Sequence, residues 1–132
     1  MMKEKYLVYV DDDPDDRMLF KEAFDSMPEY KLLTLVNGFE LLLFLKQRNQ
    51  GELPYLIVLD INMPVMNGLE ALSILKTNET YKKIPIVMFT TSANPEAVEY
   101  CKNLGTDIII KPTKYSEIRN VFQELLYSLE SN

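Results

Sequence analysis

Five aspartates lie within six positions near the start of the chain, in the stretch VYVDDDPDDR (residues 8–17). They directly follow an apolar, β-branched run, and carboxylates placed so close together repel one another. A cation held by several of them would offset that repulsion. Because the chain has no histidine and only one cysteine, its metal ligands would be hard oxygens, which favour Mg²⁺.

Polar side chains also end three later apolar runs. Asp60 ends YLIVLD, Thr90 ends the run that begins at Ile84, and Lys111 follows DIII. In a parallel α/β sheet the carboxyl ends of the strands meet at one edge, and ligands bind there. We therefore expect these groups to meet the aspartates of the first run in one site.

Such a site suits phosphoryl transfer, which depends on positioning and on neutralising charge. We expect Asp60 to accept a phosphoryl group as an aspartyl phosphate. Asp11 and Asp12 would hold Mg²⁺ together with Asp60. Thr90 would donate a hydrogen bond to one phosphoryl oxygen, and Lys111 would pair with another.

The pattern along the chain predicts the frame that brings these residues together. Apolar runs predict strands at residues 6–10, 31–36, 55–60, 84–92 and 107–112, and apolar periodicity predicts helices at 14–24, 38–48, 68–76, 95–104 and 115–129. Asn67 and Asn94 are expected N-caps, and Gly105 is expected to end the fourth helix. Strict alternation predicts an α/β fold: a doubly wound, five-stranded parallel sheet with helices on both faces.

The spacing of apolar residues also predicts which side of each helix is buried. In the first helix these residues are Met18, Leu19, Ala23 and Phe24. In the third helix they are Leu69, Leu72, Ile74 and Leu75.

The composition fits one globular domain. The 132 residues are 47% hydrophobic and 26% charged, so we expect a single domain over residues 1–132, with a core at about 5–129 and no effector domain. The net charge of −6 argues against nucleic acid as a partner. No signal peptide or membrane span is evident, and Cys101 has no second cysteine to pair with. These features predict a soluble, cytoplasmic protein without a membrane or nucleic-acid partner.

Four motifs, VDDD…R, VLDINMPVMNG, IVMFTTSA and IIIKP, occur in this order. Together they resemble the response-regulator receiver domain of two-component signalling, the CheY-like family, over essentially the entire chain. The stretch DDDPDDRMLFKEAF also resembles, more faintly, small regulators found beside phytochrome-type kinases. The resemblance implies a flavodoxin-like (βα)5 fold with strand order 2-1-3-4-5.

The resemblance also implies a role for each matching residue. Asp60 is similar to the family's phosphoacceptor, and Asp11 and Asp12 are similar to its acidic pair. Asn62 would offer its backbone carbonyl to Mg²⁺. Two further positions, Thr90 and Lys111, match the switch hydroxyl and the lysine that contacts phosphate, and a cis peptide is implied before Pro112.

A protein with this resemblance is a signalling module, not an enzyme with a separate substrate: it catalyses only its own phosphorylation and dephosphorylation. Its phosphoryl donor would be a histidine kinase or a histidine phosphotransfer protein. We expect the face built from residues 95–104, 107–112 and 115–129 to bind a downstream protein or a second copy of the chain. Ile108 and Thr113 stand where the family usually has aromatic residues, so we expect an output mechanism that does not rotate an aromatic ring.

Two alternatives stay open. An aspartate-nucleophile phosphatase of the haloacid-dehalogenase type needs a second acid two residues after the nucleophile, where this chain has Asn62. A phosphorylation-independent receiver-like module usually lacks the acidic pair, the phosphoacceptor or the lysine, and all of these residues are present here.

Overall fold

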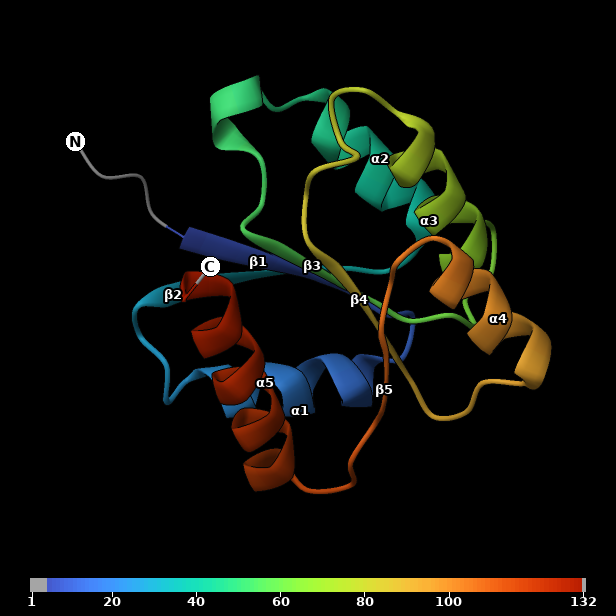
Figure 1. Cartoon of the computed structure of the whole chain (residues 1–132). Coiled ribbons are helices and arrows are strands. Elements are labelled where there is room, and N and C mark those ends of the chain that lie inside the picture. Colours follow the sequence, from blue (N-terminus) through green and yellow to red (C-terminus); the bar gives the residue numbers. More distant parts are fainter. Residues whose placement is uncertain (1–4, 132) are drawn as a thin grey trace.

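A computed structural model describes residues 5–131, and its five strands form one parallel sheet (Figure 1). The strands are β1 (Lys5–Val10), β2 (Tyr30–Leu35), β3 (Leu56–Leu59), β4 (Ile86–Thr90) and β5 (Ile108–Ile110). Their order in the sheet is β2-β1-β3-β4-β5, and every neighbouring pair is parallel. The predicted α/β fold and its strand order are therefore confirmed.

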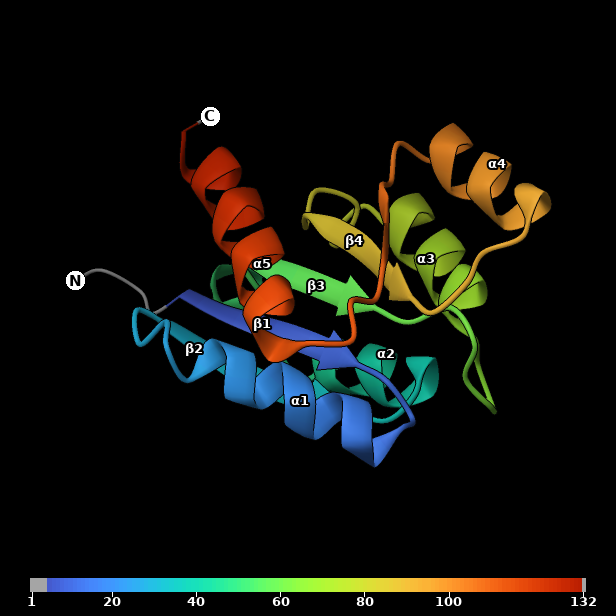
Figure 2. The same cartoon turned by 90° about the horizontal axis from the view of Figure 1, so that it is seen from below.

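Helices cover both faces of this sheet. They are α1 (Pro14–Phe24), α2 (Gly38–Lys46), α3 (Gly68–Thr77), α4 (Pro95–Asn103) and α5 (Tyr115–Glu130), with a short 3₁₀ turn, η1 (Gln50–Glu52). Helices α1 and α5 lie on one face, and α2, α3 and α4 lie on the other (Figures 1 and 2). In the described part of the chain, no helix is long and apolar enough to cross a membrane.

Each face of the sheet buries its own apolar cluster. Along β1, Leu7 and Tyr9 pack with residues of α1 and α5, whereas Val8 and Val10 pack with residues of α2, α3 and α4. This alternation follows from the two-residue period of a strand. All four residues of β3 are buried, as expected for a strand covered on both sides.

The buried face of α1 differs from the prediction. Met18 is 64% exposed, whereas Phe20 is fully buried. The Phe20 ring stacks on Tyr9, with ring centroids 4.2 Å apart, and meets Phe122 edge-on. Packing with these two rings sets the rotation of the helix and turns Met18 outward. In α3, Ile74 is likewise 41% exposed, so its predicted burial was also wrong.

The expected helix ends are confirmed. The Asn67 side chain accepts a hydrogen bond from the Glu70 amide at 2.9 Å, and Asn94 accepts one from the Ala97 amide at 2.8 Å. Gly105 follows α4 with φ of +66°, a conformation that glycine adopts without steric cost. The two asparagine caps fix where α3 and α4 begin, beside the loops that leave β3 and β4.

Candidate functional site

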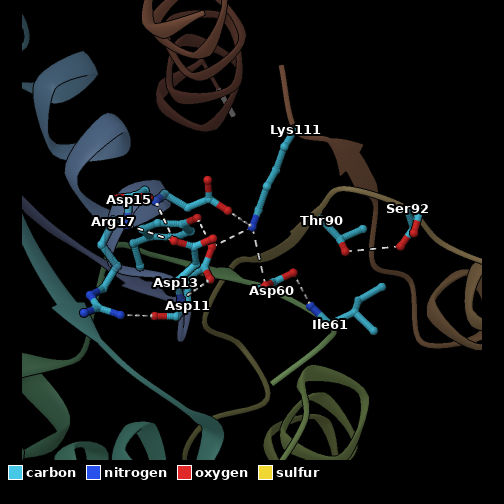
Figure 3. Close-up of polar contacts among 11 residues, drawn as sticks. Asp11, Asp13, Asp15, Arg17, Asp60, Ile61, Thr90, Ser92 and Lys111 are labelled. Atoms are coloured by element: carbon cyan, nitrogen blue, oxygen red, sulfur yellow. Dashed lines mark hydrogen bonds and ion pairs between the residues drawn. The ribbon is translucent and has the colours of Figure 1, made fainter. Parts of the chain in front are cut away.

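The carboxyl ends of four strands bring together the residues predicted from the sequence. Asp11 follows β1, Asp60 follows β3, Thr90 ends β4 and Lys111 follows β5. The strand order makes β3 the neighbour of both β1 and β4, so Asp60 lies at the centre of the group. Figure 3 shows Lys111 reaching across this edge toward Asp60 and the aspartates that follow β1.

The Lys111 ammonium joins three carboxylates. Its Nζ lies 2.6 Å from Asp11 Oδ2, 2.9 Å from Asp16 Oδ2 and 3.4 Å from Asp60 Oδ2, and its side chain is 8% exposed. Burial alone would lower the pKa of Lys111, but the hydrogen bonds to Asp11 and Asp16 raise it above its usual value. Lys111 is therefore a fixed positive charge within an acidic site.

The Lys111–Pro112 peptide is trans, as are all the peptide bonds among residues 5–131. The cis bond implied by the resemblance is therefore absent from this structure. A peptide before proline favours trans by about 0.5–1 kcal/mol unless tertiary contacts select the other isomer. Lys111 makes its three carboxylate contacts with the bond in the trans form.

Asp60 is a buried carboxylate with a raised pKa. Its Oδ1 accepts a hydrogen bond from the Ile61 amide at 2.8 Å. Burial and the neighbouring charge of Asp11 raise its pKa to about 6, while Lys111 and Thr90 act in the opposite direction. Lys111 and Thr90 therefore favour the anionic form, which is the nucleophilic form.

Asp11 is fully buried and is held on both of its oxygens. Oδ1 accepts a hydrogen bond from the Asp13 amide at 3.0 Å, and Oδ2 accepts one from Lys111. The Tyr9 hydroxyl also donates to Oδ2. Burial and this hydrogen bond raise the pKa of Tyr9 above its usual value, so the phenol stays protonated. Arg17 donates to the backbone carbonyl of Asp11 at 2.7 Å and so stabilises the loop between β1 and α1.

The donor set fits a hard divalent cation. Asp11, Asp12 and Asp60 each offer an oxygen, and these oxygens lie within 4.8 Å of one another. Asp12 is exposed to solvent, which leaves room for the water ligands that Mg²⁺ retains. Within residues 5–131, no hydrogen bond engages the carbonyl oxygen of Asn62, so that carbonyl is free to bind a cation.

Thr90 connects the site to α4. Its side chain is fully buried, and its hydroxyl donates to the Ser92 carbonyl at 3.2 Å. The hydroxyl is also close enough to Asp60 to favour the ionised carboxylate. Ser92 lies in the loop that leads to the Asn94 cap of α4. A change in the Thr90 hydrogen bond would therefore affect this loop and the start of that helix.

Gly68 holds α3 against the backbone that follows β3. A Cβ at this position would lie 2.0 Å from the Asp60 carbonyl oxygen, closer than any side chain can approach. The Gly68 amide donates to the Ile61 carbonyl at 2.8 Å. The glycine that ends the VLDINMPVMNG motif is therefore required by the close packing of two backbones.

Two functional contacts were missed by reasoning from the sequence. Asp16, in the first turn of the first predicted helix, was given no part in the site, but it pairs with Lys111. Tyr9 was expected only to form part of a strand, but its hydroxyl reaches Asp11. The two-residue alternation places Tyr9 and Asp11 on the same side of the chain and could have indicated their contact. Asp13 is the N-cap of α1, since its side chain accepts from the Asp15 amide at 2.8 Å.

Comparison with known proteins identifies the family of this chain. The family model of the response regulator receiver domain matches residues 7–123. Response regulator Rcp1 of Synechocystis is 31% identical, and the aligned region covers 96% of this chain and 87% of that protein. A protein-glutamate methylesterase of Methanococcoides burtonii is 34% identical, but the chain spans only 32% of its length.

Two solved structures share the fold. The phosphorylated cyanobacterial phytochrome response regulator RcpA has a TM-score of 0.81 and 28% identity, with 93% of this chain and 91% of that chain covered. The Mn²⁺-bound form of Rcp1 has a TM-score of 0.79 and 28% identity, with coverages of 89% and 91%. The matched family model, the parallel sheet of order β2-β1-β3-β4-β5 and the acidic site at its edge agree: the chain belongs to the response-regulator receiver domain family of two-component signalling.

Proposed function

We propose that this receiver domain accepts a phosphoryl group on Asp60 with the help of Mg²⁺, and that it signals by phosphorylation-dependent binding to another protein. The observation that carries this proposal is the convergence on Asp60 of two further carboxylates, Asp11 and Asp12, and the ammonium of Lys111. Asp60 thus belongs to a candidate cation site and also lies 3.4 Å from a fixed positive charge. The donor would be a histidine kinase or a histidine phosphotransfer protein.

In the proposed reaction, an oxygen of Asp60 attacks phosphorus, and the bond from phosphorus to the donor group breaks as the acyl phosphate forms. Lys111, already 3.4 Å from Asp60, would pair with one phosphoryl oxygen. Thr90 would donate to another. The backbone amide of Ile61 holds the carboxylate in place through its hydrogen bond.

Asp11, Asp12, Asp60 and the Asn62 carbonyl would hold the cation. When bound, Mg²⁺ would neutralise charge that develops on the phosphoryl oxygens. Two relatives support this assignment: Rcp1 is known in a Mn²⁺-bound form, and RcpA is known in a phosphorylated form.

The proposed output runs from Thr90 to α4. On phosphorylation, the Thr90 hydroxyl would leave the Ser92 carbonyl and turn toward the phosphoryl group, shifting the loop before α4. A groove of about 610 Å³ between α4 and β5 lies next to this loop, and its lining includes Val98, Ile108 and Ile110. Because half-buried Ile108 is smaller than the usual aromatic residue, we propose that the groove itself changes, without the sweep of a ring. The α4–β5–α5 face would then bind the target protein or a second copy.

This role is that of a single-domain signalling module in the cytoplasm, which catalyses only its own phosphorylation and dephosphorylation. The direct test is incubation with acetyl phosphate and Mg²⁺, followed by intact mass spectrometry. We expect a gain of one phosphoryl group that requires Mg²⁺ and disappears in Asp60→Asn. Incorporation that persists in that variant would remove Asp60 as the acceptor.

A further inference from the structure

Tyr9 carries a polar group into the aromatic core beneath the acidic site. The residue is fully buried, and its ring stacks on Phe20 at 4.2 Å and meets Phe89 edge-on at 6.0 Å. A phenylalanine would make the same ring contacts. The hydroxyl therefore adds nothing to this packing, and within residues 5–131 its hydrogen bond goes to Asp11 Oδ2.

The hydrogen bonds to Asp11 leave a defined part of its carboxylate open. A carboxylate oxygen has about two acceptor positions. The Tyr9 hydroxyl and Lys111 use both positions of Oδ2, whereas the Asp13 amide uses one position of Oδ1. Among the residues that the structure describes, one acceptor position of Oδ1 is left for a cation.

We propose that the Tyr9 hydroxyl is a positioning group that fixes the rotation of the Asp11 carboxylate and thereby sets the affinity of the site for a divalent cation. This inference rests on the proposed Mg²⁺-dependent function. Hydrogen-bonded partners of metal-binding carboxylates commonly contribute 10–100-fold to affinity. Lys111 cannot replace Tyr9 in this role, because its ammonium is shared with Asp16 and Asp60.

The test is the Mg²⁺ dissociation constant of Tyr9→Phe, measured by titration calorimetry and, with Mn²⁺, by electron paramagnetic resonance of the free ion. We expect the dissociation constant to rise about tenfold or more, while the ring packing is kept. Tyr30→Phe is the matched control. Tyr30 is also buried and its hydroxyl also donates to a carboxylate, that of Glu130 at 2.6 Å, but it begins β2 at the other end of the sheet.

A second measurement does not depend on the variant. In the parent protein labelled at tyrosine Cζ, the Tyr9 resonance should shift when Mg²⁺ is added, and the Tyr30 resonance should not. If Tyr9→Phe does not fold, this spectrum decides the question: an unmoved Tyr9 signal in a protein that binds Mg²⁺ overturns the proposal.

A folded Tyr9→Phe that binds Mg²⁺ as tightly as the parent, or more tightly, would also overturn the proposal and leave the hydroxyl with a structural role only. That outcome leaves the proposed function intact, because the parent still binds the cation. A parent protein that binds no Mg²⁺ and gains no phosphoryl group would overturn the proposed function and this inference together.

Discussion

Among the individual residues of the site, carboxylates lie close enough together to repel one another. Asp60 and Asp11 are both buried, and the pKa of Asp60 is raised to about 6 from a usual value of 3.8. A carboxyl group with a raised pKa binds its proton more tightly in the folded state than in the unfolded state. Its contribution to stability is therefore fully present below about pH 4 and is lost as the pH rises through about 6.

Asp60→Asn should remove the free-energy cost of ionising a buried carboxyl group in the folded protein. In Mg²⁺-free buffer at pH 7.5, we expect the variant to be more stable than the parent by on the order of 1–3 kcal/mol. The advantage should vanish near pH 4, where the parent carboxyl is protonated. Denaturant unfolding of both proteins across this range is the measurement. If the difference in the free energy of unfolding between parent and variant did not change with pH, the raised pKa of Asp60 would be contradicted.

Substitutions of the adjacent residues Asp12 and Asp13 should have different effects, one on cation binding and the other on helix capping. Asp12 is exposed and belongs to the candidate cation site, so Asp12→Ala should weaken Mg²⁺ binding at least about tenfold. Relief of repulsion should leave the metal-free protein as stable as before or slightly more stable.

Asp13→Ala should behave in the opposite way. Loss of the N-cap of α1 should cost about 1 kcal/mol of stability. Mg²⁺ affinity should stay unchanged, because the backbone amide that holds Asp11 remains. Calorimetric titration and denaturant unfolding of both variants provide the comparison. Equal effects of the two substitutions on Mg²⁺ affinity would contradict the assignment of Asp12, and not Asp13, to the cation site.

At the scale of elements, the loop between β3 and α3 contains a strained residue. Val65 has φ of +68° and is 81% exposed, and a side chain with a Cβ is disfavoured in this region by about 1–2 kcal/mol. Val65→Asn should raise the free energy of unfolding by about 1 kcal/mol, since asparagine tolerates the conformation. Val98→Asn on helical α4 is the control and should not stabilise. A decrease in stability for Val65→Asn would rule out strain as the dominant effect.

The link from Thr90 to α4 predicts a local response to phosphorylation. With a beryllofluoride phosphoryl mimic, amide exchange across residues 90–110 should change in the parent. The response should be much weaker in Thr90→Ala, although Asp60 still binds the mimic. It should persist in Ile108→Val, which keeps the branched shape. Thr91→Ala is the matched control, because Thr91 is exposed. Changes confined to α1 would place the output elsewhere.

On the surface of the molecule, the α4–β5–α5 face presents several exposed apolar side chains. Ile110 is 55% exposed, Val98 46% and Tyr115 53%. Ile110→Lys should weaken phosphorylation-dependent self-association or target binding, measured by sedimentation with the phosphoryl mimic present, and should leave phosphate uptake unchanged. Met18→Lys, at a position 64% exposed on α1, should change neither property. An equal effect of both substitutions would contradict a specific face.

Much of the architecture follows from local sequence patterns. Alternating apolar runs predicted all five strands and five helices to within a few residues, because strand and helix periods are read directly from the chain. The caps at Asn67 and Asn94 were also predictable, because each capping hydrogen bond joins residues only three positions apart. The polar strand ends predicted which residues would meet, since a parallel sheet brings its carboxyl ends together.

Contacts between distant residues needed the tertiary structure. The pairing of Asp16 with Lys111 joins residues 95 positions apart, and no local pattern distinguishes it from an ordinary acid in the first turn of a helix. Met18 is exposed because Phe20 packs against Tyr9 and Phe122 and thereby sets the rotation of α1. The reach of the Tyr9 hydroxyl to Asp11 depended on how the buried ring packs. Local sequence patterns therefore predict the elements and the polar groups at their ends, whereas side-chain packing across the sheet selects the residues that hold those groups in place.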